Sequence, residues 1–417
     1  RAEHYMTGNT VLEIQSGDVE KFKTNLLNYL LTLEAKNYPY DVMAIQHSGY
    51  LTDNSPPSTF ASDIIAQWND IFEWPKLATS TAGNFFREME ERYSASFPVI
   101  RGAWPDWWTD GFGASAREVA ATRAAEGSVI ANMAGLSMAA VNSIAIPDVT
   151  AEKVDLAKNA LLFYTEHTLG YSESVREPFS QPTMEQRALK ESYAWEAVRR
   201  TASVGEEAMG LLQSMFSLEK EPSLLIFNTL SWARSGLITV YIDHQIVPRG
   251  QIAGIFDQEG NRMPCQAVSD RSDGTYWAIW VKDVPAFGFR KYSVKPVAGD
   301  MTSGTANDET TLENQWYRIV TDKKKGTIQS LFDKNLNKDI TDQQCNYRLG
   351  EFILEKLGNR SQMESKRLDD FKRIPLDTVW FDSAARGEIW NSIKFYGESE
   401  TAIGPRGFSI EFRLFNT

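Results

Sequence analysis

The sequence predicts a multidomain protein that combines an α/β segment, a three-helix bundle and β-sandwich domains. The chain of 417 residues is longer than one hydrophobic core usually accommodates. Helical and strand patterns dominate different stretches of it, and 42% hydrophobic with 24% charged residues is an ordinary globular composition. We expect domains at residues 1–110, 111–218, 219–300 and 301–417, the last of them truncated.

Residues 1–110 alternate helical patterns with short apolar runs. Residues 18–36 begin with an acidic turn and carry apolar residues at helical spacing, which indicates an amphipathic helix. The run at 42–46 is typical of a buried parallel strand. Further helices are expected at 58–72 and 82–93, with a second candidate strand within 74–81. This stretch is therefore predicted to be the last part of an α/β domain.

The middle of the chain is predicted to be a three-helix bundle. Long helical patterns run near 115–142, 150–166 and 182–216, and no strong strand pattern interrupts them. Prolines at the connections, among them Pro147 and Pro178, separate the helices as prolines usually do.

Beyond residue 219 the pattern changes to short alternating runs separated by Gly, Asn and Asp. Such runs are typical of antiparallel β-sandwiches. The runs are SLLIFNT, GLITVYI, TYWAIWVKDV, FRKYSV, QWYRIVTD, EFILEKL and, at the end of the chain, GFSIEFRLFNT.

Charge and composition narrow the classes of ligand. A net charge of -12 argues against nucleic acid, because phosphate backbones are bound by clustered Lys and Arg. Twelve tryptophans suit stacking on sugar rings, although most of them are expected to fill cores. Two cysteines provide neither a disulfide framework nor a cysteine zinc site. The sequence contains no apolar run of 18 residues, so it predicts no membrane span.

His167 is the most informative of the four histidines, because it lies in FYTEHTLGYSES at the end of a predicted bundle helix. A histidine between a helix end and a loop can turn its ring into a cleft as a metal ligand or base. The alternative is a capping or core histidine.

The order of these segments resembles the zinc α-mannosidases of glycoside hydrolase family thirty-eight over nearly the whole chain. EHTLGYSES is similar to the bundle motif in which that family's histidine binds zinc. GAWPDWWTDGFGASARE resembles the passage from catalytic domain to bundle. FNTLSWARSGLITVYI, VPAFGFRKYSV and QWYRIVTDKKKGTIQSLFDK are similar to its β-domain strands. Residues 1–110 would then be the C-terminal part of a barrel-like catalytic domain.

The resemblance implies a zinc ion that grips two sugar hydroxyls, a carboxylate nucleophile and a second carboxylic acid. It assigns His167 as a zinc ligand and Asp53 as the general acid, although an Asx turn at Asp53 is equally open. Trp107 and Trp108 are expected as a sugar-stacking platform, with one ring in the cleft and one in the core. Asp106 would accept hydroxyl hydrogen bonds.

His47 is expected either to line the same cleft or to have a structural role. Together these assignments predict a retaining glycoside hydrolase that acts on α-mannosides or related α-linked sugars. The chain alone is expected to be inactive, because one imidazole cannot hold zinc and the other ligands of the family's motif are not matched.

Two alternatives remain open. A polysaccharide lyase would also join helices to β-sandwiches, but it would favour a basic cleft for uronic acids. A non-catalytic carbohydrate-binding or structural fragment would hold no zinc. The expected partners are an oligosaccharide or glycoside substrate, and either the missing N-terminal part of the protein or a second copy of the chain. No nucleic-acid or membrane partner is expected, and a bacterial periplasmic or secreted location is favoured.

Overall fold

The computed structural model describes most of the chain. The described residues are 5–50, 54–102, 109–166, 173–174, 176–298, 310–359, 361–364, 369–402 and 407–416. The chain divides into two compact units, Arg1–Trp104 and Pro105–Thr417, and each is described by itself.

The described part of the first unit is helical. Asp18 caps the N-terminus of its longest helix by accepting hydrogen bonds from the backbone N–H groups of Glu20 and Lys21, at 2.9 and 3.1 Å. The predicted helices are confirmed within a few residues at each end. The elements are α1 (Thr7–Thr10), η1 (Ile14–Ser16), α2 (Val19–Ala35), α3 (Phe60–Ile71), α4 (Ala82–Tyr93) and η2 (Ser94–Ser96).

Trp68 is the centre of the core of the first unit. The indole is 2% exposed and meets Phe22 of α2 edge to face, with ring centroids 5.6 Å apart. Its Nε1–H donates to the carbonyl of Pro75 at 2.7 Å, so the buried polar edge of the ring is satisfied. Helices α2 and α3 are therefore held together by one large side chain that also fixes the segment after α3.

The strands predicted at 42–46 and within 74–81 are wrong for the described residues, because both segments are extended without joining a sheet. A parallel strand needs backbone hydrogen bonds from neighbouring strands. For residues 42–48, the described backbone–backbone hydrogen bond to a distant segment is the one that the Gly8 N–H donates to the Gln46 carbonyl, at 2.8 Å. Met43 and Ile45 nevertheless pack on the helical core. The α/β layer is thus absent from the described part of the first unit.

Asparagine side chains take the place of strand neighbours along both extended segments. Asn9 accepts from the N–H of Ser48 at 2.9 Å and donates to the Ser48 carbonyl at 3.2 Å. Asn69 donates to the Leu77 carbonyl at 2.8 Å and accepts from the Leu77 N–H at 3.1 Å. A carboxamide carries the same donor and acceptor as a peptide group. Each side chain therefore pairs with one residue of the segment as a β-ladder would.

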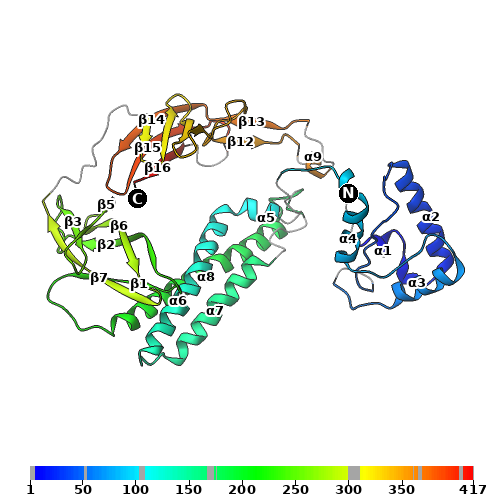
Figure 1. Ribbon diagram of the computed structural model, residues 1–417, viewed down its shortest axis with the longest axis horizontal. Coiled ribbons are helices and arrows are strands. Elements are labelled where there is room, and N and C mark those ends of the chain that lie inside the picture. Colours follow the sequence, from blue (N-terminus) through cyan, green and yellow to red (C-terminus); the bar gives the residue numbers. More distant parts are fainter. Residues whose placement is uncertain are drawn as a thin grey trace. The chain divides into compact units, whose positions relative to one another are not determined.

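Three long helices pack side by side at the start of the second unit (Figure 1), which confirms the three predicted helical segments. They are α6 (Ala116–Val141), α7 (Asp148–Thr165) and α8 (Gln181–Gln213), preceded by the short α5 (Thr109–Ala114). Helix α8 packs along both α6 and α7. The buried contact positions are mostly small, among them Ala139, Ala157, Ala194 and Ala197.

Helix α6 has a mean hydropathy of 1.2 over an 18-residue window. Among the described helices, it is the one whose length and composition would allow it to span a membrane. Ala125, Val129 and Leu136 of α6 lie in the bundle core, and 28% of that apolar window is buried.

The first β-sandwich has two antiparallel sheets, one with strand order β1-β7-β3-β4 and one with β2-β6-β5. Side chains of both sheets meet in one core that includes Ile255, Trp277 and Val294. The strands are β1 (Ser223–Asn228), β2 (Arg234–Asp243), β3 (Ile252–Phe256), β4 (Arg262–Met263), β5 (Cys265–Asp270), β6 (Gly274–Val284) and β7 (Gly288–Val297).

The second β-sandwich packs the sheet β11-β10-β9-β8 against the sheet β14-β15-β16. A separate hairpin pairs β12 with β13. The elements are β8 (Thr311–Glu313), β9 (Tyr317–Asp322), β10 (Thr327–Asp333), β11 (Lys338–Asp339), β12 (Ile353–Lys356), α9 (Ser361–Glu364), β13 (Lys372–Pro375), β14 (Thr378–Ala385), β15 (Trp390–Glu398) and β16 (Gly407–Phe415). The predicted antiparallel character of this half is confirmed.

The two sandwiches are joined by polar contacts around Gln266 and Glu388. One Gln266 oxygen accepts from the N–H groups of both Ile389 and Trp390, each at 3.1 Å. Glu388 pairs with Arg262 at 2.7 Å and accepts from the backbone N–H of Cys265 at 3.0 Å. Side chains from both sandwiches are also buried together beside this joint.

Replacing Asn69 with alanine is expected to speed hydrogen exchange at the Leu77 amide by roughly tenfold or more. The variant leaves the backbone N–H and C=O of Leu77 without their partner, which costs about 1–3 kcal/mol, and about 1.4 kcal/mol corresponds to tenfold in an equilibrium. Exchange measured by mass spectrometry on a peptide spanning residues 73–82 checks this. Asn28→Ala, on the exposed side of α2, is the matched control because it makes the same change of helix propensity. Equal exchange rates in the Asn69→Ala variant and the unaltered protein would contradict this account of the segment.

Candidate functional site

Most of the side chains that the sequence singles out lie outside the described residues. These are Asp53, Asp106, Trp107, Trp108 and His167. The structure describes the residues that flank them, together with His47.

His47 ends the extended segment that follows α2, and its ring is half-buried. Both ring nitrogens are buried, and neither has a hydrogen-bond partner among the described residues. Burial lowers the pKa of His47 from its ordinary value of 6.5, because the charged imidazolium loses hydration. The ring is thus neutral at pH 7, which is the form that binds a metal or accepts a proton.

Gly8 brings the first helix against His47. A Cβ atom at position 8 would lie 2.9 Å from both the His47 Cβ and the Gln46 carbonyl oxygen, so only glycine fits without displacement. The place of His47 in a cleft, as the sequence predicts it, remains a prediction.

The start of α6 and the end of α7 lie at the same end of the helical bundle. The rings of Phe112 and Tyr164 contact each other edge to face, with centroids 6.5 Å apart. Arg187 of α8 donates to the carbonyl of Ala114 at 3.0 Å, which ties the end of α5 to the same place. The chain that leads to Trp108 and the chain that follows Thr165 are therefore attached to one end of the bundle.

Glu118 is a buried carboxylate at this bundle end, 3% exposed. Burial opposes its ionisation, but hydrogen bonds from Arg117, at 2.6 and 2.8 Å, and from Trp195 outweigh burial and hold its pKa below the usual range. The Arg117 guanidinium also lies 5.1 Å from the centre of the Trp195 ring. A negative charge is thus fixed inside the end of the bundle.

Tyr164 lies beside this charge and is 1% exposed. Its hydroxyl has no hydrogen-bond partner among the described residues. Burial, followed by the charges of Glu118 and Glu191, raises its pKa to about 12, so the phenol stays protonated. Neither Tyr164 nor Glu118 was among the residues predicted from the sequence. Glu118 shares the buried face of α6 with Ala125, Val129 and Leu136, and a glutamate at helical spacing from such residues is the signal that could have found it.

The last described residue before His167 is anchored by a cation. Glu166 forms an ion pair with Lys190 of α8, and the same ammonium donates to the carbonyl of Phe163 at 3.0 Å. A cation at these last carbonyls satisfies groups that the helix itself leaves free and opposes the negative end of the helix dipole. The direction in which the chain leaves α7 is thereby fixed up to residue 166.

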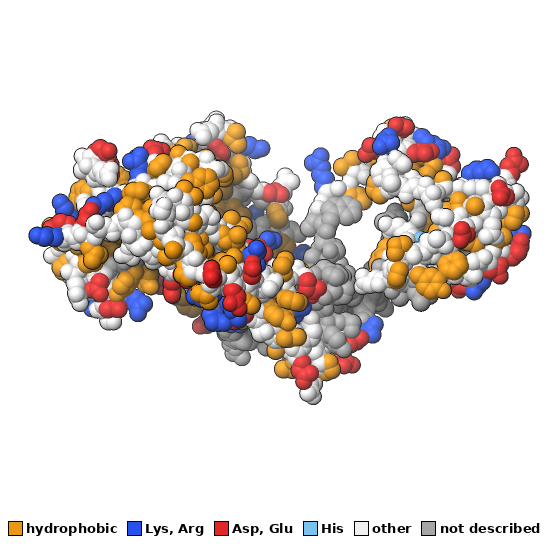
Figure 2. Space-filling model, turned by 90° about the horizontal axis from the view of Figure 1, so that it is seen from below, with side chains coloured by type: hydrophobic (Ala, Val, Ile, Leu, Met, Phe, Trp, Pro, Cys, Tyr) orange, Lys and Arg blue, Asp and Glu red, His pale blue; other side chains and the backbone are white. Residues whose placement is uncertain are grey.

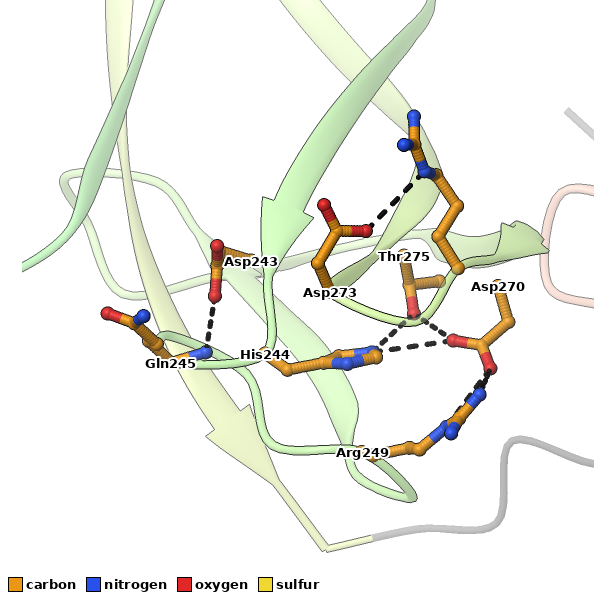
Figure 3. Close-up of polar contacts among 8 residues, drawn as sticks. Asp243, His244, Gln245, Arg249, Asp270, Asp273 and Thr275 are labelled. Atoms are coloured by element: carbon orange, nitrogen blue, oxygen red, sulfur yellow. Dashed lines mark hydrogen bonds and ion pairs between the residues drawn. The ribbon is translucent and has the colours of Figure 1, made fainter.

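The second described histidine, His244, lies in a polar network of the first sandwich (Figure 3). Its Nε2 is 3.2 Å from the Thr275 hydroxyl and 3.4 Å from Asp270, and that hydroxyl donates to Asp270 at 2.8 Å. Arg249 donates to the other Asp270 oxygen at 2.7 Å. In a catalytic triad the nucleophile and the carboxylate contact different ring nitrogens. Here Thr275 and Asp270 both contact Nε2 of His244, and Thr275 is buried, so the three side chains are not arranged as a triad. The network instead joins the turn after β2 to the β5–β6 hairpin.

Metal-binding side chains do not cluster among the described residues, where no group of three or more His, Cys, Asp or Glu is suited to hold an ion. Zinc sites use three or four protein ligands. The described residues alone therefore do not fit a zinc site.

His47 is expected to titrate with a midpoint below 6.5. Because its folded-state pKa is lowered, its contribution to stability is complete above pH 6.5 and is lost as the pH falls through the folded-state pKa. Proton–carbon NMR of labelled histidine rings, with His47→Gln used to assign the signal, measures the midpoint. A midpoint at or above 6.5 would show that the ring is not desolvated as described.

Comparison with known proteins finds no matching family model and no matching curated protein. Solved structures are among the matches. One is a protein in glycosyl hydrolase family 38 from Enterococcus faecalis, with 13% identity, a TM-score of 0.45, and coverage of 91% of this chain and 46% of that one. Another is an α-mannosidase from Enterococcus faecalis V583, with 15% identity, a TM-score of 0.47, and coverage of 94% and 47%. The chain spans about half the length of each.

Proposed function

We propose that this chain is part of a retaining glycoside hydrolase that acts on α-mannosides or related α-linked sugars and uses a zinc ion. The proposal assigns His167 to the metal, Asp53 to proton donation, and Trp107, Trp108 and Asp106 to sugar binding, with His47 in the same cleft. The remaining metal ligands and the nucleophile would come from the rest of the protein or from a second copy of the chain.

The observation that carries the proposal is the contact between Phe112 and Tyr164 at one end of the bundle. Phe112 follows Trp108 closely in the chain, and Tyr164 closely precedes His167. Two motifs that are distant in sequence are therefore attached near each other, as residues of one site must be. The ion pairs of Glu118 with Arg117 and of Glu166 with Lys190 lie at the same end of the bundle.

The surface charge favours an uncharged ligand. On the face drawn in Figure 2, the described Lys and Arg side chains are scattered among acidic and apolar ones rather than gathered into a patch. With a net charge of -12, this pattern gives no electrostatic attraction for nucleic acid or polyuronic acid. Among glycans, a neutral one therefore suits this surface better than a polyanionic one.

Retention of configuration needs two carboxyl groups about 5–5.5 Å apart, one as nucleophile and one as acid and then base. The proposal gives Asp53 the second role, in which it protonates the leaving oxygen and later takes the proton of the attacking water. Zinc would polarise and orient two neighbouring hydroxyls of the sugar. The described residues do not themselves complete such a metal site.

The complete gene product is expected to contain one equivalent of zinc and to release sugar with retained configuration, which proton NMR of the fresh product resolves. His167→Ala should lose the zinc, measured by elemental analysis, and at least about 10³-fold in kcat/KM, or about 4 kcal/mol. His244→Gln is the control and should keep both, because His244 belongs to the network of the first sandwich.

Other results of this experiment separate the alternatives. A protein that binds sugar without zinc would be a binding module. An unsaturated product would identify a lyase. Either result would overturn the proposal.

Asp53→Asn is expected to slow hydrolysis of alkyl α-mannosides by about 10²–10⁴-fold, the usual contribution of a general acid. With a 2,4-dinitrophenyl leaving group kcat/KM, which reports only the first step, should change far less, because that group departs without a proton. Asp63→Asn, an exposed carboxylate of α3, is the control. Equal losses with both leaving groups would exclude Asp53 as the acid.

A further inference from the structure

The sheet β14-β15-β16 has one face in the core of the second sandwich and one face turned outward. Ile393, Phe395 and Leu414 pack inward against the sheet β11-β10-β9-β8. Since successive residues of a strand point to opposite faces, the residues that alternate with them point away from that core. The outward set includes Trp380, Lys394, Tyr396, Ser409 and Glu411.

Two aromatic rings lie next to each other on this outward face. Trp380 of β14 and Tyr396 of β15 are directly opposite in the strand register. Their rings are nearly parallel, with an interplanar angle of 29° and centroids 6.1 Å apart. Trp380 is 45% exposed although it is one of the largest apolar side chains in the domain. The pair forms an aromatic surface at the edge strand of the sheet.

Cations lie over the Tyr396 and Trp390 rings of this sheet. The Lys394 ammonium lies 4.6 Å from the centre of the Tyr396 ring, and the Arg413 guanidinium lies 5.1 Å from that of Trp390. Among the described residues no cation lies over Trp380. A cross-strand aromatic pair that only stabilises the sheet does not require its larger ring to stay open to solvent.

Charged groups of both signs lie on the same sheet as the open ring. Lys394 donates to the Tyr396 hydroxyl at 3.0 Å and lies 3.9 Å from Asp382. Arg413 pairs with Glu411 at 2.7 Å. Two cations and two carboxylates sum to zero charge, and Lys394 and Asp382 keep about a third of their side chains in solvent, at 33% and 34%. Their donors and acceptors are therefore available to an uncharged polar ligand.

We propose that this face binds a neutral saccharide, with the Trp380 ring as its platform. A sugar presents an apolar C–H face that packs on an indole, and its hydroxyl groups both donate and accept. Asp382 and Glu411 accept from such hydroxyls, and Lys394 donates to them. Balanced charge gives no preference for phosphate or uronate ligands, so the class is a neutral oligosaccharide or glycan chain. The choice of mannose as the probe sugar, and only that choice, rests on the proposed function.

The test is affinity electrophoresis of the whole chain in native gels that contain soluble α-mannan or dextran, with EDTA present and His167 replaced by alanine. Catalysis and zinc are thereby removed from the experiment. We expect α-mannan to retard the chain, and Trp380→Ala to weaken the binding about tenfold or more, equivalent to about 1.4 kcal/mol. Trp380→Phe should keep an intermediate affinity.

Trp232→Ala is the matched control, because Trp232 is a tryptophan of the first sandwich that is 60% exposed. Unchanged retardation of Trp232→Ala supports the assignment, and an equal loss in both alanine variants overturns it. Retardation by dextran alone supports a saccharide site while contradicting the mannose specificity of the proposed function. No retardation in either gel, or full retardation of Trp380→Ala, overturns the inference whatever the result of the zinc and hydrolysis assays.

Discussion

The close packing of α8 between α6 and α7 is the constraint on which the rest of the second unit depends. Ala139, Ala157, Ala194 and Ala197 are fully buried at these contacts, and such small side chains let the helix axes approach closely. At one end α8 carries Arg187 and Lys190, which hold α5 and the end of α7. At the other end Phe216 packs on Phe289 of the first sandwich, with ring centroids 4.7 Å apart. A larger residue at any of the four alanine positions would move both ends at once.

Patterns that depend on local structure could be predicted from the sequence. The bundle helices were found because their periodicity is uninterrupted and prolines lie between them. Several strands were found because one face of each is buried, as in β2 and β16. Strand β15 was missed because it is buried on both faces near its start, so that Trp390, Asn391 and Ser392 do not alternate in polarity. The segment at 42–46 shows the opposite case, in which a strand-like pattern lacks the neighbours that make a strand.

The sequence supplies candidate site residues by type but not their environment. His167 was singled out from its position between a predicted helix and a loop, and its role stays a prediction. The buried ring nitrogens of His47 were not foreseeable, because burial depends on Gly8 and on residues that come close only in the folded chain. Glu118 was missed for the same reason: its burial and its bonds from Arg117 and Trp195 involve two helices. The pKa of such a side chain depends on tertiary contacts, and the order of residues along the chain does not show those contacts.

The joint between the two sandwiches has an evolutionary consequence. A methyl group added at Gly387 would lie 2.1 Å from the side chain of Gln266, which already gives its oxygen to two successive amides. A side chain at Gly387 therefore requires the Gln266 carboxamide to move and to give up its hydrogen bonds to the amides of Ile389 and Trp390. Homologous sequences should therefore show the two sites changing together, and a recombinant that exchanges one sandwich without the other would inherit a steric conflict at the seam.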